Sequence, residues 1–151
     1  MSTHKNSDAD EQALADYLKT FDMVAEPGLA TDYYDFMVYD FETELYRAIA
    51  EVKRVGKKTY KEHDDTVMPM TKFINLKNAA AALGLRFWYF ILTEDDQGAD
   101  AFYLADLTNF KPQQISRNGR KDRGRANDIR HLIHIPLSRF GRCDKKGSIL
   151  L

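Results

Sequence analysis

The chain has 151 residues, a net charge of −1 and one cysteine, with 44% hydrophobic and 30% charged side chains. This length fits one domain with its own core, and the composition is that of an ordinary globular protein. We find no apolar run long enough for a bilayer and no signal peptide, and a single cysteine excludes an internal disulfide or a cysteine-based zinc cluster. We therefore expect a soluble protein in a reducing compartment, the cytoplasm.

The charges are distributed unevenly along the chain. Residues 1–51 carry 12 acidic and 3 basic side chains, whereas the rest of the chain carries 11 acidic and 19 basic ones. Such a split fits a cation site beside a surface that binds a polyanion. It is also what scattered, solvated surface charge produces, so composition alone leaves both interpretations open.

The first third of the chain predicts a helix followed by a hairpin. After a flexible N-terminus over residues 1–7, the spacing of Leu14 and Leu18 predicts an amphipathic helix over 8–21. Residues 33–39 and 46–55 are rich in aromatic and β-branched side chains, which are typical of strands. A turn between them makes an antiparallel hairpin the expected arrangement.

The following residues predict a second helix and a buried strand. Residues 57–70 have no clear pattern, and a helix is expected from Thr71 until Gly84 ends it. The run 86–92, Arg-Phe-Trp-Tyr-Phe-Ile-Leu, is too apolar for a sheet edge, so we expect a central strand that is buried on both faces.

The last part of the chain predicts further strands separated by a polar loop. Strands are expected over 101–107 and 130–137, and the polar residues 111–128 between them predict a loop. The order α-β-β-α-β-β, with a last short strand, predicts an α/β fold, a mixed sheet flanked by helices. We place this single domain over 8–140 and a C-terminal tail over 141–151.

The strand around residue 51 carries the most informative pattern. Side chains alternate between the faces of a strand, so Glu51 and Lys53 lie on the same face as Ile49 and Val55. A carboxylate and an ammonium on a mostly apolar face are costly to bury unless they are paired or bind something. The plainer alternative is an ion pair on a solvated edge strand, which contributes less than about 1 kcal/mol.

Two further acids could join this face. If the predicted hairpin forms, Asp35 can lie across from Glu51, and two carboxylates that meet in a cleft favour a divalent cation. Glu11 lies one turn before Leu14 on the apolar stripe of the first helix, so it faces the sheet as well. Glu11 is also explained as a first-turn acid that the helix dipole favours.

This pattern resembles the PD-(D/E)xK nuclease superfamily, which includes restriction endonucleases, archaeal Holliday-junction resolvases and small phage proteins. The resemblance lies in Tyr34-Asp35-Phe36-Met37-Val38, then Ala50-Glu51-Val52-Lys53-Arg54, a helix beginning near Thr71-Lys72, and the strand Phe87-Trp88-Tyr89-Phe90-Ile91. It covers about residues 8–107 and implies a restriction-endonuclease-like fold. One departure is that Tyr34, not proline, precedes the aspartate.

The resemblance implies a metal-dependent nuclease that hydrolyses phosphodiester bonds in DNA. Asp35 and Glu51 would hold Mg²⁺ or Mn²⁺ together with Val52, and Lys53 would be the catalytic lysine that assists the attacking water. Glu11 fits the acid that some members carry on a helix. If the chain is encoded by a phage, its location would be the cytoplasm of the host cell.

Basic residues in the second half are candidates for contacts with nucleic acid. They are Lys72, at the start of the second helix, and Arg117, Arg120, Lys121, Arg123 and Arg125. Lysine and arginine bind phosphates, although a solvated, disordered loop would have the same composition. His131 and His134, three residues apart on a strand, point to opposite faces and are not expected to bind one metal together.

Two alternatives to the nuclease remain open. The chain could be a catalytically inactive nucleic-acid-binding module on the same fold, or a phage-encoded module that binds a protein through its acidic half. DNA is the expected partner of the nuclease, a protein partner that of the last alternative, and no membrane partner is expected. A homodimer is a further possibility, because one small domain seldom encloses a duplex.

Overall fold

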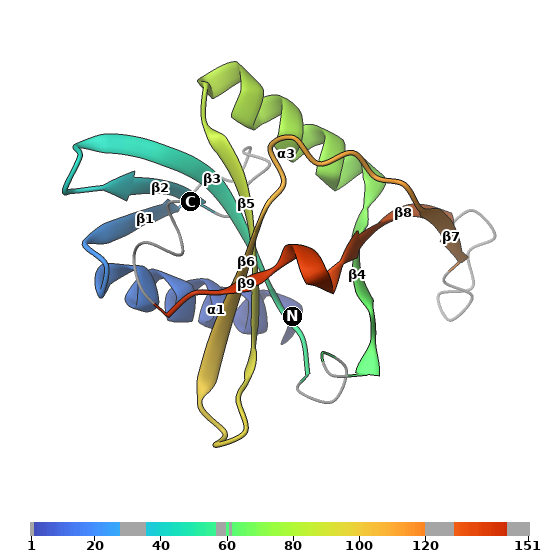
Figure 1. The fold of residues 1–151 in the computed structure, drawn as a ribbon, viewed down its shortest axis with the longest axis horizontal. Helices are drawn as coiled ribbons and strands as arrows, with labels where there is room; N and C mark the ends of the chain where they lie inside the picture. Colours follow the sequence, from blue (N-terminus) through green and yellow to red (C-terminus); the bar gives the residue numbers. More distant parts are fainter. Residues whose placement is uncertain (1, 28–35, 57–59, 61, 120–128, 145–151) are drawn as a thin grey trace.

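Two β-sheets and two α-helices make up the described part of the chain in this computed structural model, residues 2–27, 36–56, 60, 62–119 and 129–144 (Figure 1). In chain order the elements are α1 (Ser2–Lys19), β1 (Met23–Pro27), β2 (Phe36–Asp40), β3 (Leu45–Arg54), β4 (Asp65–Pro69), α3 (Met70–Leu83), β5 (Arg86–Glu94), β6 (Asp100–Asp106), β7 (Ile115–Gly119), β8 (Ile129–Pro136), the 3-10 helix η2 (Leu137–Arg139) and β9 (Gly141–Arg142).

The larger sheet has six strands in the order β1-β2-β3-β5-β6-β9. Strands β3 and β5 run parallel, and the other neighbouring pairs are antiparallel. The chain passes from β3 to β5 through β4 and α3, which is the long connection that a parallel pair requires. The predicted class, an α/β protein with a mixed sheet and flanking helices, is confirmed.

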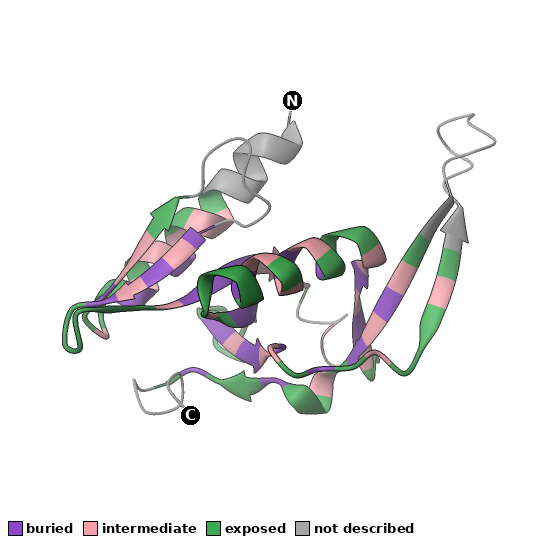
Figure 2. Ribbon diagram, turned by 90° about the horizontal axis from the view of Figure 1, so that it is seen from above, coloured by how far each residue is buried: buried purple, intermediate pink, exposed green. Residues whose placement is uncertain are grey.

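The two helices pack against opposite faces of this sheet. Leu14 of α1 and Ala50 of β3 belong to one hydrophobic cluster, which we call the α1-side cluster. Leu76 of α3 and Ile49 of β3 belong to the other, the α3-side cluster. Seen from above, α3 shows mostly exposed and intermediate residues over the buried strands beneath it (Figure 2). Each face of β3 is therefore covered by its own helix.

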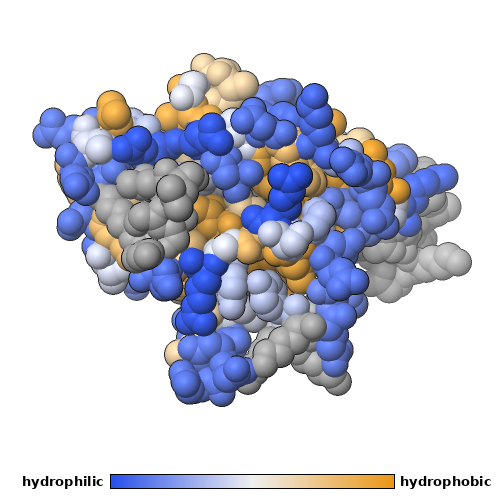
Figure 3. Space-filling view, viewed as in Figure 1, coloured by the Kyte–Doolittle hydropathy of each residue, from blue (hydrophilic) through white to orange (hydrophobic). Residues whose placement is uncertain are grey.

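The smaller sheet has the order β4-β8-β7 and shares the α3-side cluster with the larger one. Met68 of β4 and Ile133 and Ile135 of β8 contribute to that cluster. The β7–β8 hairpin extends away from the larger sheet (Figures 1 and 2). Hydrophilic residues cover most of the face seen in Figure 1, and hydrophobic residues show between them near its centre (Figure 3).

Several predicted elements are confirmed. The second helix ends where Gly84 adopts a left-handed conformation, with φ of 68°. Backbone N–H groups at this cap donate hydrogen bonds to the carbonyl oxygens of Ala80 and Ala81 in the last turn. The strand β5 has seven consecutive buried residues, 87–93, and lies between β3 and β6. Strands β2 and β3 form the expected antiparallel hairpin, with a bulge between Val38 and Tyr39.

Other predictions need correction. The first helix spans Ser2–Lys19, not 8–21, and the strand Met23–Pro27 follows it at the sheet edge, where a proline is tolerated. Residues 57–70 include β4, and the predicted loop 111–128 includes β7. Strand β8 is followed by β9, which lies beyond residue 140. The predicted order α-β-β-α-β-β therefore omitted β1, β4, β7 and β9. None of the described helices is long and apolar enough to cross a membrane.

Candidate active site

Strand β3 sets two charged side chains on the face of the sheet that α3 covers. Ile49 belongs to the α3-side cluster, whereas Ala48 and Ala50 belong to the α1-side cluster. Since side chains alternate along a strand, Glu51 and Lys53 point to the α3 side together with Ile49. The predicted shared face of Glu51 and Lys53 is confirmed, and its apolar surroundings argue against a solvated edge pair.

Glu51 is a buried carboxylate that contacts a cation on α3. The residue is 4% exposed, and its Oε2 atom lies 2.9 Å from Nζ of Lys72. Burying a carboxylate is costly unless a positive charge or hydrogen bonds compensate for the lost water. The start of α3 therefore both covers this carboxylate and offsets its charge.

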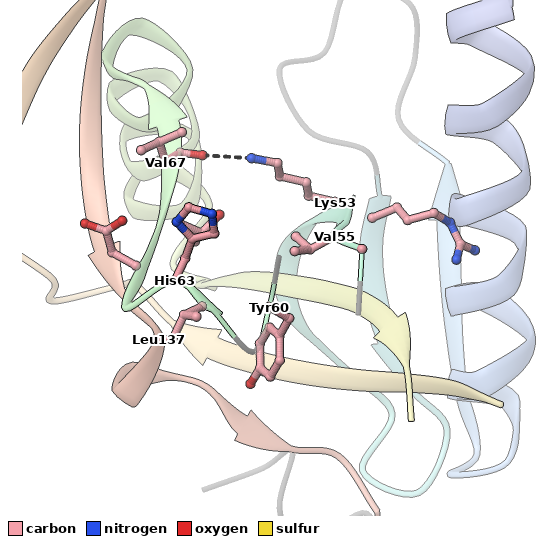
Figure 4. A pocket seen from close by; sticks show the side chains of 10 residues that line it. Lys53, Val55, Tyr60, His63, Val67 and Leu137 are labelled. Carbon is pink, nitrogen blue, oxygen red and sulfur yellow. Dashed lines mark hydrogen bonds between the residues drawn. The ribbon is translucent and has the colours of Figure 1, made fainter. Parts of the chain in front are cut away.

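Lys53 reaches from the larger sheet to the smaller one. Its Nζ atom donates a hydrogen bond of 3.3 Å to the backbone carbonyl oxygen of Val67 on β4 (Figure 4). Burial lowers the pKa of Lys53 below its usual value, and the positive charge of Lys72 lowers it further. The ammonium is thus oriented by β4 and held in a partly desolvated position.

A cavity of about 460 Å³ opens beside Lys53, between the end of β3 and strand β4. Side chains from separate segments surround it (Figure 4), among them Lys53, Val55, Tyr60, His63 and Leu137. The volume lies within the range of pockets that bind small organic ligands, about 300–1,000 Å³. Lys53 therefore lies at the wall of a hollow that can admit part of a substrate.

Asp35, the other predicted carboxylate, lies outside the described residues and directly precedes Phe36 in the chain. The register of the hairpin pairs Phe36 with Ala50, which is the residue before Glu51. The described strands therefore have the antiparallel pairing on which the prediction for Asp35 depended, and its role as a ligand stays a prediction.

The other two predicted ligands lie on α1 and on β3. Glu11 is on α1, which packs on the opposite face of the sheet from Glu51. A contact of 2.8 Å between Arg54 Nε and Asp10 Oδ1 nevertheless brings this part of α1 to the end of β3. Val52 pairs with Phe90 of β5 and its side chain packs on the α1-side cluster, so only its backbone could serve as a ligand on the α3 side.

The predicted nucleic-acid contacts are described only in part. Lys72 contacts Glu51, as given above, and Arg117 is an exposed residue of β7 that pairs with His131 of β8. Arg120, Lys121, Arg123 and Arg125 lie outside the described residues. The strands of the β7–β8 hairpin lead into this basic segment from both sides.

Sequence reasoning missed the contribution of residues 60–67 to this site. Tyr60 and His63 line the cavity, and the Val67 carbonyl accepts the hydrogen bond from Lys53. The sequence contains only the short run Thr66-Val67-Met68 here. The alternation of buried and less buried residues along β4 is visible in the structure. That pattern spans five residues, which is too short to assign a strand with assurance.

The residues around Glu51 supply part of the ligand set that a divalent cation requires. Mg²⁺ and Mn²⁺ prefer oxygen ligands, and the buried carboxylate of Glu51 is such a ligand. Within residues 2–27, 36–56, 60, 62–119 and 129–144, no group of three or more His, Cys, Asp or Glu side chains is placed to hold a metal ion. Glu51 fits the cation, and Asp35, which lies outside these ranges, stays a predicted second ligand.

The structure has a mixed sheet whose interior strand β3 carries the Glu-x-Lys pair of Glu51 and Lys53. These features agree with the class of PD-(D/E)xK proteins that the sequence resembles. The family model described as "Phage putative PDDEXK endonuclease" matches residues 3–143, and the chain belongs to this family. No curated protein and no solved structure matches the chain.

Proposed function

We propose that this protein is a Mg²⁺- or Mn²⁺-dependent endonuclease that hydrolyses phosphodiester bonds in DNA. The observation that carries the proposal is the shared face of β3, where buried Glu51 and partly buried Lys53 lie two residues apart and Lys53 lines a cavity. The description of the family to which the chain belongs names an endonuclease, which supports the proposal. The restriction-endonuclease-like form of the fold is part of this proposal.

Glu51, Asp35 and the backbone carbonyl of Val52 would hold the cation, and Glu11 is a further candidate from α1. Asp35 directly precedes Phe36 in the sequence, and Phe36 pairs with Ala50, the residue before Glu51. When bound, the cation supplies Lewis-acid polarisation of the phosphoryl oxygen and lowers the pKa of a water molecule.

Lys53 would stabilise negative charge as the reaction proceeds. Hydrolysis forms a bond from a water oxygen to phosphorus, breaks one ester P–O bond and delivers a proton to the leaving oxygen. A preoriented ammonium next to the phosphoryl oxygens stabilises the charge that develops on them. The hydrogen bond to the Val67 carbonyl fixes the orientation of Lys53 before substrate binds.

Contacts with the DNA backbone would come from basic residues around this site. Lys72 lies at the start of α3 beside Glu51, and Arg117 lies exposed on β7. Arg120, Lys121, Arg123 and Arg125 follow Arg117 in the chain. Such contacts fix a nuclease on the phosphate backbone without reading the base sequence.

The test is cleavage of supercoiled plasmid, linear duplex, single-stranded and branched DNA with Mg²⁺ or Mn²⁺. We expect cleavage of at least one substrate, its loss in EDTA, and its loss in Asp35→Asn, Glu51→Gln and Lys53→Met. Glu94→Gln and Lys19→Met are matched controls, because both residues are exposed and neither lines the cavity. Cleavage of none of these substrates, or equal cleavage by wild type and Lys53→Met, would refute the proposal.

The same experiment addresses the inactive binding module. Binding of DNA that needs no metal, survives Glu51→Gln and leads to no cleavage would support that alternative. Stable association with a protein and no affinity for DNA at moderate salt would instead support the protein-binding alternative.

A further inference from the structure

We infer that Lys72 occupies the cation position at Glu51 in the metal-free protein and withdraws when a divalent cation binds. The inference rests on the proposed function and assigns a regulating residue to that same site. The inference predicts two effects of removing the Lys72 charge. The protein should bind the metal ion more tightly, and it should bind DNA more weakly.

The two partners of this ion pair differ in burial. The side chain of Glu51 is 6% exposed and that of Lys72 is 45% exposed. The carboxylate is therefore fixed within the core, whereas the ammonium lies at the end of a long side chain that can turn to solvent. Breaking this contact takes a positive charge away from a buried carboxylate, which is costly, so a second cation that takes this position favours the release of Lys72.

Helix electrostatics disfavour a lysine at the start of α3. Lys72 lies in the first turn, next to the positive end of the helix dipole. That turn contains no acidic residue, and the N-cap residue Pro69 makes no side-chain capping bond. The contact with Glu51, 2.9 Å away, offsets this unfavourable placement.

Lys53, the other lysine of the site, does not occupy the cation position beside Glu51. Lys53 is turned toward the Val67 carbonyl on β4, 3.3 Å away, while Lys72 approaches Glu51 from α3. A metal ion and an ammonium cannot both occupy the position beside Oε2 of Glu51. Metal binding would thus release the Lys72 ammonium next to the site, where a phosphate of the substrate can bind it.

The primary test is the affinity for Mn²⁺ without DNA, measured by titration calorimetry on the full chain. We expect Lys72→Met to bind Mn²⁺ about two- to fivefold more tightly, the range that a partly exposed ion pair allows. Lys77→Met is the matched control, since Lys77 lies on the same helix but donates to the Phe110 carbonyl at 3.1 Å. Its Mn²⁺ affinity should equal that of wild type, and Glu51→Gln should lose Mn²⁺ binding.

Lys72→Gln provides a second variant if Lys72→Met folds poorly, because it removes the charge but keeps a hydrogen-bond donor for Glu51. The wild-type chain gives an independent measurement. Mass-spectrometric mapping of lysine acetylation should show more modification of Lys72 when Mn²⁺ is present, with Lys77 unchanged as the internal reference.

The outcomes separate this inference from the proposed function. Tighter Mn²⁺ binding without Lys72 and greater acetylation of Lys72 with Mn²⁺ support it. Equal or weaker Mn²⁺ binding by Lys72→Met and Lys72→Gln overturns the inference and leaves the metal-dependent nuclease standing. No Mn²⁺ binding by wild type or either variant overturns both.

Discussion

The ammonium of Lys53 lies 3.3 Å from the backbone carbonyl oxygen of Val67, so the lysine of the candidate site links the two sheets. This bond orients the charge without neutralising it, because a carbonyl is an uncharged acceptor. The contribution of the Lys53 charge to activity can therefore be measured separately from its contribution to the stability of the fold.

Substitution of Lys53 by Met should separate activity from stability. Burial lowers the pKa of Lys53, so a charged lysine costs folding free energy there at neutral pH. Met keeps much of the side-chain volume without the charge, and the melting temperature should stay equal or rise. DNA cleavage should fall by at least about 100-fold if Lys53 stabilises developing charge. A loss of cleavage that only parallels a fall in melting temperature would show that Lys53 acts through folding.

Much of the larger sheet could be predicted because its signals are local. Seven consecutive buried residues mark β5, and the Glu51–Lys53 face follows from alternation within one strand. The smaller sheet lacks such signals. His134 of β8 bonds Asp65 of β4 across 69 positions of the sequence, and no short window contains that pairing.

The same distinction applies to the candidate site. Residues on β3 were found from the sequence, whereas the contact of Lys72 with Glu51 depends on how α3 packs over β3. Side-chain spacing within α3 says nothing about which strand lies beneath it. The predicted hairpin pairing is confirmed up to Phe36, the residue after Asp35. The role of the Asp35 carboxylate stays a prediction that the Asp35→Asn variant tests.

His134 should hold the smaller sheet together. Its ring nitrogens lie 2.8 Å from Asp65 Oδ2 on β4 and 2.8 Å from Ser116 Oγ on β7. Replacing His134 by Ala leaves both partners without this hydrogen bond, at a cost of about 1–2 kcal/mol in the free energy of unfolding. Hydrogen exchange should accelerate in both β4 and β7, because within the described residues each is an edge strand that pairs with β8 in this sheet.

The control for this prediction is His131→Ala. His131 is exposed and lies on the opposite face of the same strand. Denaturant unfolding and hydrogen exchange on both variants decide the question. Equal effects of the two substitutions would show that the bonds to Asp65 and Ser116 do not stabilise the sheet.

Asp106 should contribute stability that depends on pH. Burial raises the pKa of this carboxyl, but hydrogen bonds from Arg86, 2.7 Å away, and from Thr108 outweigh it and hold the pKa below its usual value. A lowered pKa in the folded protein stabilises it above the unfolded pKa of about 4, and this contribution is lost as pH falls through the folded value.

The corresponding variant is Asp106→Asn. Solvent screens this half-buried pair, so we expect a loss of only about 0.5–1 kcal/mol at pH 7. The difference in unfolding free energy between wild type and variant should shrink between pH 5 and pH 3, measured by urea unfolding. A difference that stays constant with pH would rule out the charge of Asp106 as its cause.

Cys143 should make the folded protein sensitive to alkaline pH. Burial, with a smaller effect from Asp144, raises the pKa of the Cys143 thiol from its usual 9.0 to about 12. The thiol is packed in the α1-side cluster and is 2% exposed. The folded protein therefore keeps its proton where the unfolded chain releases it, and the resulting stability is complete below pH 9 and is lost as pH rises toward 12.

Comparison of wild type with Cys143→Ala isolates this contribution from the lysines and tyrosines that also titrate there. Between pH 6 and 8 the two unfolding free energies should differ by a constant amount, which reflects the lost packing of the sulfur. Above pH 9 the wild-type value should fall more steeply, by up to about 1.4 kcal/mol per pH unit. Parallel curves up to pH 11 would mean that the thiolate is tolerated in the folded state, and the packing of Cys143 against the α1-side cluster would then have to open without unfolding the chain.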